Sequence, residues 1–184
     1  NARGVRDGRH PLRETLDVVE REIRRISRQL RDFVTFSRRK RSVGRYTDLN
    51  GVVHDVVTLL AYNPSARGCD IQTRLSRDLP PVRAEEDLVV QILLNLCINA
   101  LDAMIDGGTL TIVTGATEGW VTIRVEDSGP GIAEGLRERI FDALWSTKPP
   151  GQGTGLGLFM GRKIADTLGG ELVLVRTDGT GTIF

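Results

Sequence analysis

The sequence has 184 residues, of which 40% are hydrophobic, and a formal net charge of +1. These values are typical of a globular chain and exclude an intrinsically disordered one. No apolar run reaches the roughly 18–20 residues needed to cross a bilayer, so we expect no membrane contact from this chain. The near-neutral total hides an asymmetry: residues 1–45 contain 14 Lys or Arg against 6 Asp or Glu, and the rest is acidic. A basic extension joined to an acidic domain is therefore expected.

The composition of the basic segment also bears on its partners. Its positive residues are interleaved with acidic ones at helical spacing, which favours a solvated helix face over a nucleic-acid-binding surface. The two cysteines, Cys69 and Cys97, form no CxxC motif and have no histidine at metal spacing. They favour ordinary packing in a reducing compartment over a disulfide or a zinc site. We therefore expect a cytoplasmic location, which a membrane anchor elsewhere in a longer protein would not change.

Residues 12–33 are predicted to form one long amphipathic helix. Its apolar positions alternate in steps of four and three, which is the heptad pattern of a coiled coil or helical bundle; they are Leu12, Leu16, Val19, Ile23, Ile26, Leu30 and Phe33. A lone helix cannot bury such a seam. It needs a partner helix, either from a second subunit in a homodimer or from chain that precedes it.

The rest of the chain is predicted to contain both helices and strands. In chain order, we predict a helix over 48–61, a strand over 69–75, a helix over 84–104, strands over 109–114 and 120–126, a helix over 156–168, and a closing hairpin of strands 171–175 and 180–184 around Asp178-Gly179. Helices and a mostly antiparallel sheet, segregated into layers, define an α+β fold.

Four short stretches in the second half carry the functional signal. They are residues 95–103 (NLCINALDA), 127–132 (DSGPGI), 151–158 (GQGTGLGL) and 178–184 (DGTGTIF). Each is a modest signal alone. In this order, the four stretches supply amides on a helix, a carboxylate beside glycines, a glycine-rich lid and a glycine turn. Together they predict a nucleotide pocket.

Asn95 and Asn99 are four residues apart on a predicted helix and so share a face. Burying two amides costs free energy unless their hydrogen bonds are satisfied. An amide oxygen is a suitable ligand for Mg²⁺, which completes its shell with waters and phosphates. The alternative is that the two side chains bond to backbone or to each other. Asp102, a turn later, could hold an outer-shell water or be solvated.

Asp127 ends a predicted strand and enters Gly129-Pro130-Gly131. A carboxylate there can accept a hydrogen bond from an exocyclic amine such as that of adenine; the alternative is a plain turn. The alternating glycines of residues 151–157 predict a mobile loop, either a lid or a linker, that runs into a helix at Leu156. Free backbone N–H groups at such a helix start attract phosphate.

This arrangement resembles the ATP-binding domain of two-component sensor histidine kinases, within the wider family of gyrase, heat-shock protein 90 and MutL. The likeness covers residues 45–184: residues 91–104 (QILLNLCINALDAM) resemble the N box, 127–132 the first glycine box, 140–149 (IFDALWSTKP) the F box, and 153–158 (GTGLGL) the second glycine box. The resemblance implies a two-layer α/β sandwich of the Bergerat type. It also implies a boundary between a bundle helix with linker, residues 1–44, and a catalytic domain, residues 45–184.

The resemblance assigns roles to individual residues. Asn99 would be the Mg²⁺ ligand, Asp127 would hold the adenine amine, and Asn95 would stand near the γ-phosphate, where gyrase relatives carry a glutamate base. Asn95, Thr147 and Lys148 are the expected catalytic residues. The expected nucleotide-binding set is Asn95, Asn99, Asp102, Asp127, Gly129, Gly131, Ile132, Thr147, Lys148, Gly153, Thr154, Gly155, Leu156, Gly157, Leu158 and Thr182.

The N-terminal segment resembles the second helix of the dimerisation and phosphotransfer bundle over residues 12–41, ending in Phe36-Ser37-Arg38. No phosphoacceptor is recognisable: His10 precedes Pro11, and His54 follows the bundle helix. The resemblance implies that the chain binds Mg-ATP and passes the γ-phosphate to a histidine outside this segment, then to a response regulator receiver domain. The alternatives are a nucleotide-gated interaction module and an ATPase. A departure from the family pattern is Ala143-Leu144-Trp145, which bears on lid packing.

Overall fold

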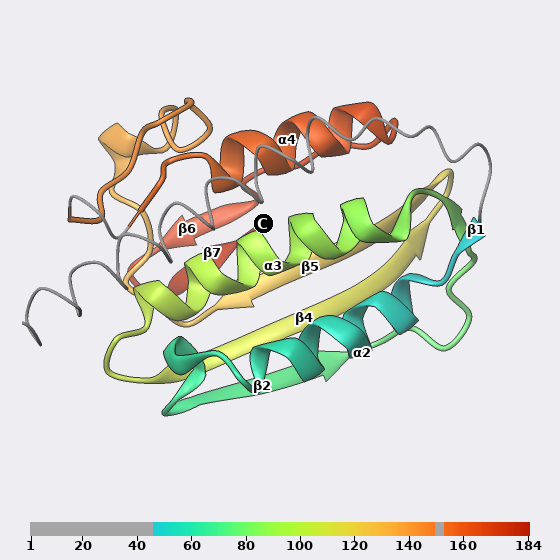
Figure 1. Cartoon of the computed structure of the whole chain (residues 1–184), viewed down its shortest axis with the longest axis horizontal. Helices are drawn as coiled ribbons and strands as arrows, with labels where there is room; N and C mark the ends of the chain where they lie inside the picture. Colours follow the sequence, from blue (N-terminus) through green and yellow to red (C-terminus); the bar gives the residue numbers. More distant parts are fainter. Residues whose placement is uncertain (1–45, 150–152) are drawn as a thin grey trace, which may run out of the picture. The chain divides into compact units, whose positions relative to one another are not determined.

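The computed structural model describes residues 46–149 and 153–184 (Figure 1). Of these residues, the larger of two compact units contains 46–145 and 155–184, and residues 146–149 and 153–154 belong to the other unit. The predicted heptad helix of residues 12–33 and the dimer contact expected through it lie outside the described residues. The domain boundary at residue 45 therefore stays a prediction.

A mixed sheet of five strands organises the larger unit (Figure 1). The strand order is β2-β4-β5-β7-β6, with β2 and β4 parallel and every other pair antiparallel. The bounds are β2 Cys69–Arg74, β4 Gly108–Thr117, β5 Trp120–Asp127, β6 Arg176–Asp178 and β7 Gly181–Ile183. A short second sheet pairs β1, Tyr46–Thr47, with β3, Val82–Arg83. The predicted α+β class with a mostly antiparallel sheet is confirmed.

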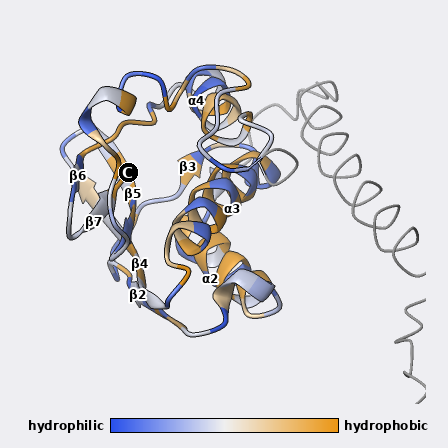
Figure 2. Cartoon of the chain, turned by 90° about the vertical axis from the view of Figure 1, so that its left-hand side faces the viewer, coloured by the Kyte–Doolittle hydropathy of each residue, from blue (hydrophilic) through white to orange (hydrophobic). Residues whose placement is uncertain are grey.

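Three α-helices lie on the same face of the five-stranded sheet (Figure 2). They are α2, Leu49–Leu60, α3, Glu86–Ala103, and α4, Gly157–Thr167. Helix α2 begins where the Asp48 side chain accepts a hydrogen bond from the Asn50 amide, at 3.0 Å, and the chain then turns into a 3-10 helix, η1, Pro64–Ala66. All three predicted helices of this part of the chain are confirmed within two residues at each end.

The core lies between these helices and the sheet. Val53, Val56, Leu110 and Ile112 are fully buried there, and Cys97 of α3 joins them. Burial raises the pKa of the Cys97 thiol to about 12, so the thiol stays protonated and inert, as expected for a cysteine used in packing. One side of α3 is thus buried in the core. The opposite side faces the start of α4.

The predicted strand over 171–175 is wrong. The strand that pairs with β7 is β6, Arg176–Asp178, one step further along the chain. Within the described part of the chain, residue 175 keeps a single ladder bond, from the Val175 amide to the Ile183 carbonyl at 2.8 Å, and β7 ends at Ile183. The apolar alternation of residues 171–175 therefore reflects burial of Leu172 and not strand pairing. The predicted closing hairpin is present, but its two-residue turn is Gly179-Thr180, one residue beyond the predicted centre at Asp178-Gly179, since Asp178 pairs with Gly181.

Candidate nucleotide-binding site

The two asparagines of the N-box stretch meet the start of α4. The Asn95 side-chain amide donates to the Gly157 carbonyl at 3.3 Å. A Cβ built on Gly157 would lie 3.7 Å from Asn99 Nδ2 and 3.8 Å from Asn95 Cγ. Both side chains are half-buried. The structure therefore brings together two motifs that are more than fifty residues apart, with the start of α4 in van der Waals range of both amides.

The N-terminus of α4 is suited to hold an anion. The first helical hydrogen bond runs from the Met160 amide to the Leu156 carbonyl at 2.8 Å, and Leu156, at the N-cap, has no side-chain oxygen with which to cap the first turn. The early N–H groups of a helix have no intrahelical partner, and the helix dipole adds a positive potential at this end. The amides of Asn95 and Asn99 stand beside this end. The arrangement offers several donors, which is what a phosphate group requires.

Asp127 lies at the last position of β5, half-buried. Its Oδ1 accepts two backbone hydrogen bonds, from the Gly129 amide at 2.9 Å and from the Thr182 amide on β7 at 3.2 Å. Burial raises the pKa of the Asp127 carboxyl, and the hydrogen bonds from Gly129 and Thr182 offset part of that rise. The carboxylate is thus a fixed acceptor in a partly dehydrated place.

The sign of this shift bears on the purpose of Asp127. A carboxyl whose pKa is higher in the folded than in the unfolded chain lowers the free energy of unfolding as pH rises between the two values. The charged form therefore costs the fold some stability at neutral pH, and protonation in acid removes both the cost and the negative acceptor. A residue kept charged against stability is a candidate for ligand binding.

The turn after Asp127 is locked onto the β6–β7 hairpin by two close backbone approaches. At Gly131, with φ of +76°, an added Cβ would lie 2.0 Å from the Asp178 carbonyl oxygen. At Gly181, with φ of +141°, it would lie 1.8 Å from the Asp127 carbonyl oxygen. Both positions need glycine for the backbone angle and for the space. The Ile132 amide adds a bond to Thr177 Oγ1 at 2.7 Å.

Sequence reasoning missed the supports of this turn. Thr177 is buried, accepts from Ile132 and lies 3.3 Å, oxygen to oxygen, from the hydroxyl of buried Thr182. Arg137 donates to the Thr177 carbonyl at 3.0 Å and to the Ile132 carbonyl at 3.3 Å. The observed register, with Asp178 paired to Gly181, places Thr177 opposite Thr182, whereas a hairpin centred on Asp178-Gly179 would have placed Thr177 opposite Thr180. Nothing in the sequence marked Arg137.

The turn also contacts the end of α3. The Ser128 hydroxyl bonds to the Met104 sulfur at 3.6 Å, and a Cβ on Gly129 would lie 3.5 Å from Met104 Cγ. The Asp127 turn therefore stands at the C-terminal end of α3, while Asn99 and Asn95 stand one and two turns back toward its start. The eight helical steps from Asn95 to Ala103 span about 12 Å. The candidate carboxylate and the candidate hydrogen-bond donors for phosphate thus lie at two positions along α3. We call these positions the adenine station, at Asp127, and the phosphate station, at Asn95, Asn99 and the start of α4.

Asp102 is oriented by a structural contact. Its Oδ1 accepts from the Ser65 hydroxyl of η1 at 2.8 Å. This bond ties the last turn of α3 to η1. The expected contact of Asp102 with a nucleotide or its waters stays a prediction. His54 is exposed on α2, within the larger unit, and its carbonyl accepts from Thr58 at 2.9 Å.

The predicted lid residues divide between the two units. Gly155 and Leu158 belong to the larger one: Gly155 lies against the backbone of Leu144 and Trp145, and Leu158 packs on the core. The other unit contains Thr147, Lys148, Gly153 and Thr154. Within it, the Lys148 amide donates to Ser146 Oγ at 3.1 Å, and a Cβ on Gly153 would approach Ser146 Oγ to 2.5 Å. Closure of these residues over phosphates stays a prediction.

The described residues supply no ready-made metal cage. No group of three or more His, Cys, Asp or Glu that could hold an ion occurs among them. A divalent cation at this site would therefore take its ligands from an amide oxygen, phosphate and water, which is how Mg²⁺ is commonly held. Asn99 fits that role. No helix in the described ranges has the length and apolarity that a membrane span requires.

The fold and the site together define a nucleotide-binding α+β domain. The model of the family described as histidine kinase-, DNA gyrase B-, and HSP90-like ATPase matches residues 84–184. The chain belongs to this family, as the ATP-binding catalytic domain of a two-component sensor histidine kinase.

Individual relatives agree with this placement. The signal transduction histidine-protein kinase AtoS of Escherichia coli K12 is 32% identical over 172 residues, which cover 93% of this chain and 28% of AtoS. Full-length ShkA in complex with AMPPNP matches with a TM-score of 0.68 and 32% identity, over 77% of this chain and 30% of that one. ThkA in complex with response regulator protein TrrA matches with a TM-score of 0.73 and 25% identity, over 97% of this chain and 51% of that one. The chain thus spans less than a third of the length of AtoS.

The close approach at Gly181 generates a prediction. Gly181→Ala should lower the free energy of unfolding by about 2 kcal/mol or more, because the methyl group meets the Asp127 carbonyl and the backbone angle is strained. Gly179→Ala is the matched control, since no atom lies within 4 Å of its Cβ position. Urea unfolding measures both. Equal stability of the two variants would contradict the described contact between the turn and β7.

Proposed function

We propose that this domain binds Mg-ATP along α3 and positions its γ-phosphate for transfer to a histidine imidazole. The observation that carries the proposal is the pair of stations on α3: the Asp127 acceptor beside Met104, and the donors of Asn95, Asn99 and the α4 N-terminus two turns away. A nucleotide has an amine at one end and phosphates at the other. The stations match these two ends in chemistry and in order.

Asp127 is proposed to accept a hydrogen bond from the exocyclic amine of adenine. Its Oδ1 is already engaged by two backbone amides, which hold the carboxylate plane fixed. Thr182, buried beside it on β7, stands within reach of the same base edge. Gly129, Gly131 and Ile132 form the turn that flanks the base. A guanine or hypoxanthine base presents a carbonyl where adenine has the amine, so the negative acceptor discriminates between them.

Asn99 is proposed to hold Mg²⁺ through its amide oxygen, and Mg²⁺, when bound, neutralises phosphate charge and supports the transfer. Asn95 is proposed to orient the γ-phosphate from the neighbouring turn of α3. Residues 155–158 offer the backbone N–H groups of the α4 start, with Thr147, Lys148, Gly153 and Thr154 closing over the phosphates. Phosphoryl transfer asks the protein mainly for positioning and charge stabilisation, which donors of this kind supply.

The transfer to histidine is favoured over hydrolysis by the residue at position 95. An amide cannot remove a proton from an attacking water, whereas a carboxylate can. A neutral imidazole needs no such base near pH 7. The acceptor histidine and the homodimer contact through residues 12–33 are assigned to the bundle part of the protein, and the longer protein then passes the phosphate to a response regulator receiver domain. ThkA, a relative, has been crystallised in complex with its response regulator. We place this chemistry in the cytoplasm.

The metal assignment predicts the behaviour of Asn99→Ala. Loss of the amide oxygen should weaken ATP binding in the presence of Mg²⁺ by about tenfold or more, while binding in EDTA stays unchanged. Calorimetric titration of both proteins under both conditions measures this. The EDTA condition controls for damage to the pocket. If Asn99→Ala binds Mg-ATP as the parent does, the metal assignment is wrong.

The fate of the γ-phosphate separates kinase, ATPase and interaction module. With ATP labelled at the γ-position, a form of the protein that extends upstream of Asn1 should acquire label that is acid-labile and base-stable, as a phosphoramidate is. Residues 1–184 alone should bind ATP without stable label. Free labelled phosphate as the main product would instead identify an ATPase. Nucleotide binding with neither product, in the longer form, would identify an interaction module and overturn the kinase proposal.

A further inference from the structure

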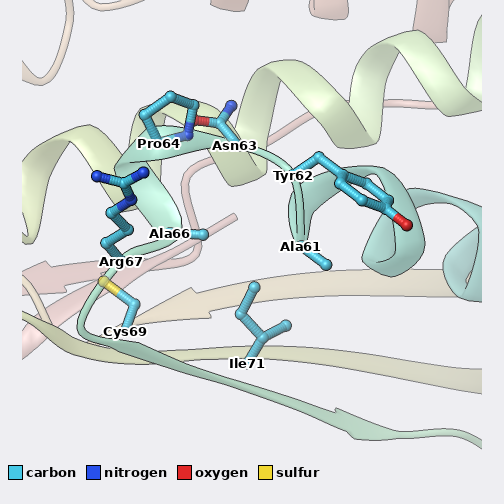
Figure 3. A pocket seen from close by; sticks show the side chains of 8 residues that line it. All are labelled: Ala61, Tyr62, Asn63, Pro64, Ala66, Arg67, Cys69 and Ile71. Carbon is cyan, nitrogen blue, oxygen red and sulfur yellow. The ribbon is translucent and has the colours of Figure 1, made fainter.

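A hollow lies away from the nucleotide stations, between the end of α2, η1 and strand β2 (Figure 3). Its volume is about 480 Å³, within the roughly 300–1,000 Å³ of typical small-molecule sites. Ile71 rises from β2 into it, and the methyl groups of Ala61 and Ala66 face it from the connection above. β2 is an edge strand, so this side of the hollow is open to solvent.

The lining has one sign of charge. Arg67 is exposed at the rim, and no acidic residue lines the hollow. Among the described residues, no carboxylate pairs with the Arg67 guanidinium. Asn63 and Tyr62 also line the hollow, where Asn63 Oδ1 accepts from the Ser65 amide at 2.9 Å and Tyr62 is exposed. The Ile71 side chain and two alanine methyl groups beside the Arg67 guanidinium fit a ligand with an apolar body and a carboxylate head, because guanidinium binds carboxylate through paired N–H groups.

The wall of the hollow is bonded to the end of α3. The Ser65 hydroxyl of η1 donates to Asp102 at 2.8 Å. The Cys69 thiol lies 3.8 Å from the Met104 carbonyl and 3.9 Å from the Ser65 carbonyl. The side chain of Met104 in turn contacts the Ser128-Gly129 turn beside Asp127. A continuous set of contacts thus joins the hollow to the proposed adenine station.

We propose that this hollow binds a small organic acid with an apolar body, and that its occupancy changes nucleotide affinity through Ser65 and the end of α3. A ligand that fixes η1 also fixes the end of α3 against which the adenine turn packs, so we expect the two ligands to favour each other. By thermodynamic reciprocity, nucleotide must raise the affinity for the acid by the same factor. The coupling rests on the proposed nucleotide site, whereas the binding of the acid does not.

The test uses 4-phenylbutyrate as the probe and 4-phenylbutyramide as its uncharged control, titrated into the 184-residue chain and followed by amide chemical shifts. The acid should shift the amides of residues 61–71 saturably, and the amide control should bind about tenfold more weakly. Arg67→Gln should weaken the acid to the level of the amide control. Arg74→Gln, an exposed arginine on β2 that does not line the hollow, is the matched variant and should change nothing.

The second arm repeats the titration of the acid with saturating ATP. The acid should bind at least about fivefold more tightly than without ATP, and Ser65→Ala should bind it but lose that gain. Absence of saturable shifts, or equal binding to Arg67→Gln and the parent, overturns the site. Equal affinity with and without ATP overturns the coupling. If ATP itself fails to bind, the nucleotide proposal fails, and the first arm still decides whether the acid site exists.

Discussion

The geometry of the site depends on one constraint, the half-buried carboxylate of Asp127 held between two backbone amides. The Gly129 amide fixes the turn that follows β5, and the Thr182 amide fixes β7 beside it. The backbone of Gly181 lies against the Asp127 carbonyl and that of Gly131 lies against the Asp178 carbonyl, which is why glycine occupies both positions. Burying the charged carboxylate lowers the stability of the fold, and the same charge provides a fixed acceptor for a ligand.

Helix α3 sets the distance between this carboxylate and the phosphate end. Its buried side, with Leu93, Cys97 and Leu101, allows it only one rotation against the sheet. That rotation brings Asn95 and Asn99 under the start of α4. Met104, the residue that follows this helix, contacts the Asp127 turn on one side and Cys69 on the other. One rigid element therefore positions both ends of the proposed nucleotide and connects them to the hollow beside β2.

The parts of this arrangement that local pattern controls could be predicted from the sequence. The three helices follow from apolar periodicity, and the glycine pattern predicted a turn over Gly129-Pro130-Gly131 and a hairpin turn that includes Gly179. The strand expected over 171–175 was wrong because apolar alternation reports burial and not the presence of a pairing partner. Thr177 and Arg137 were missed because their importance lies in long-range hydrogen bonds to the Ile132 turn. Such contacts leave no local signal.

The base preference of Asp127→Asn tests the central claim most directly. The parent should bind ATP about 10- to 100-fold more tightly than inosine triphosphate, as a hydrogen bond to a charged group allows. The variant should lose this preference while its free energy of unfolding stays equal or rises, since an amide keeps an oxygen for Gly129 and Thr182 but carries no buried charge. Calorimetric titration with both nucleotides, beside urea unfolding, measures this. An unchanged preference in a stable variant would contradict the account.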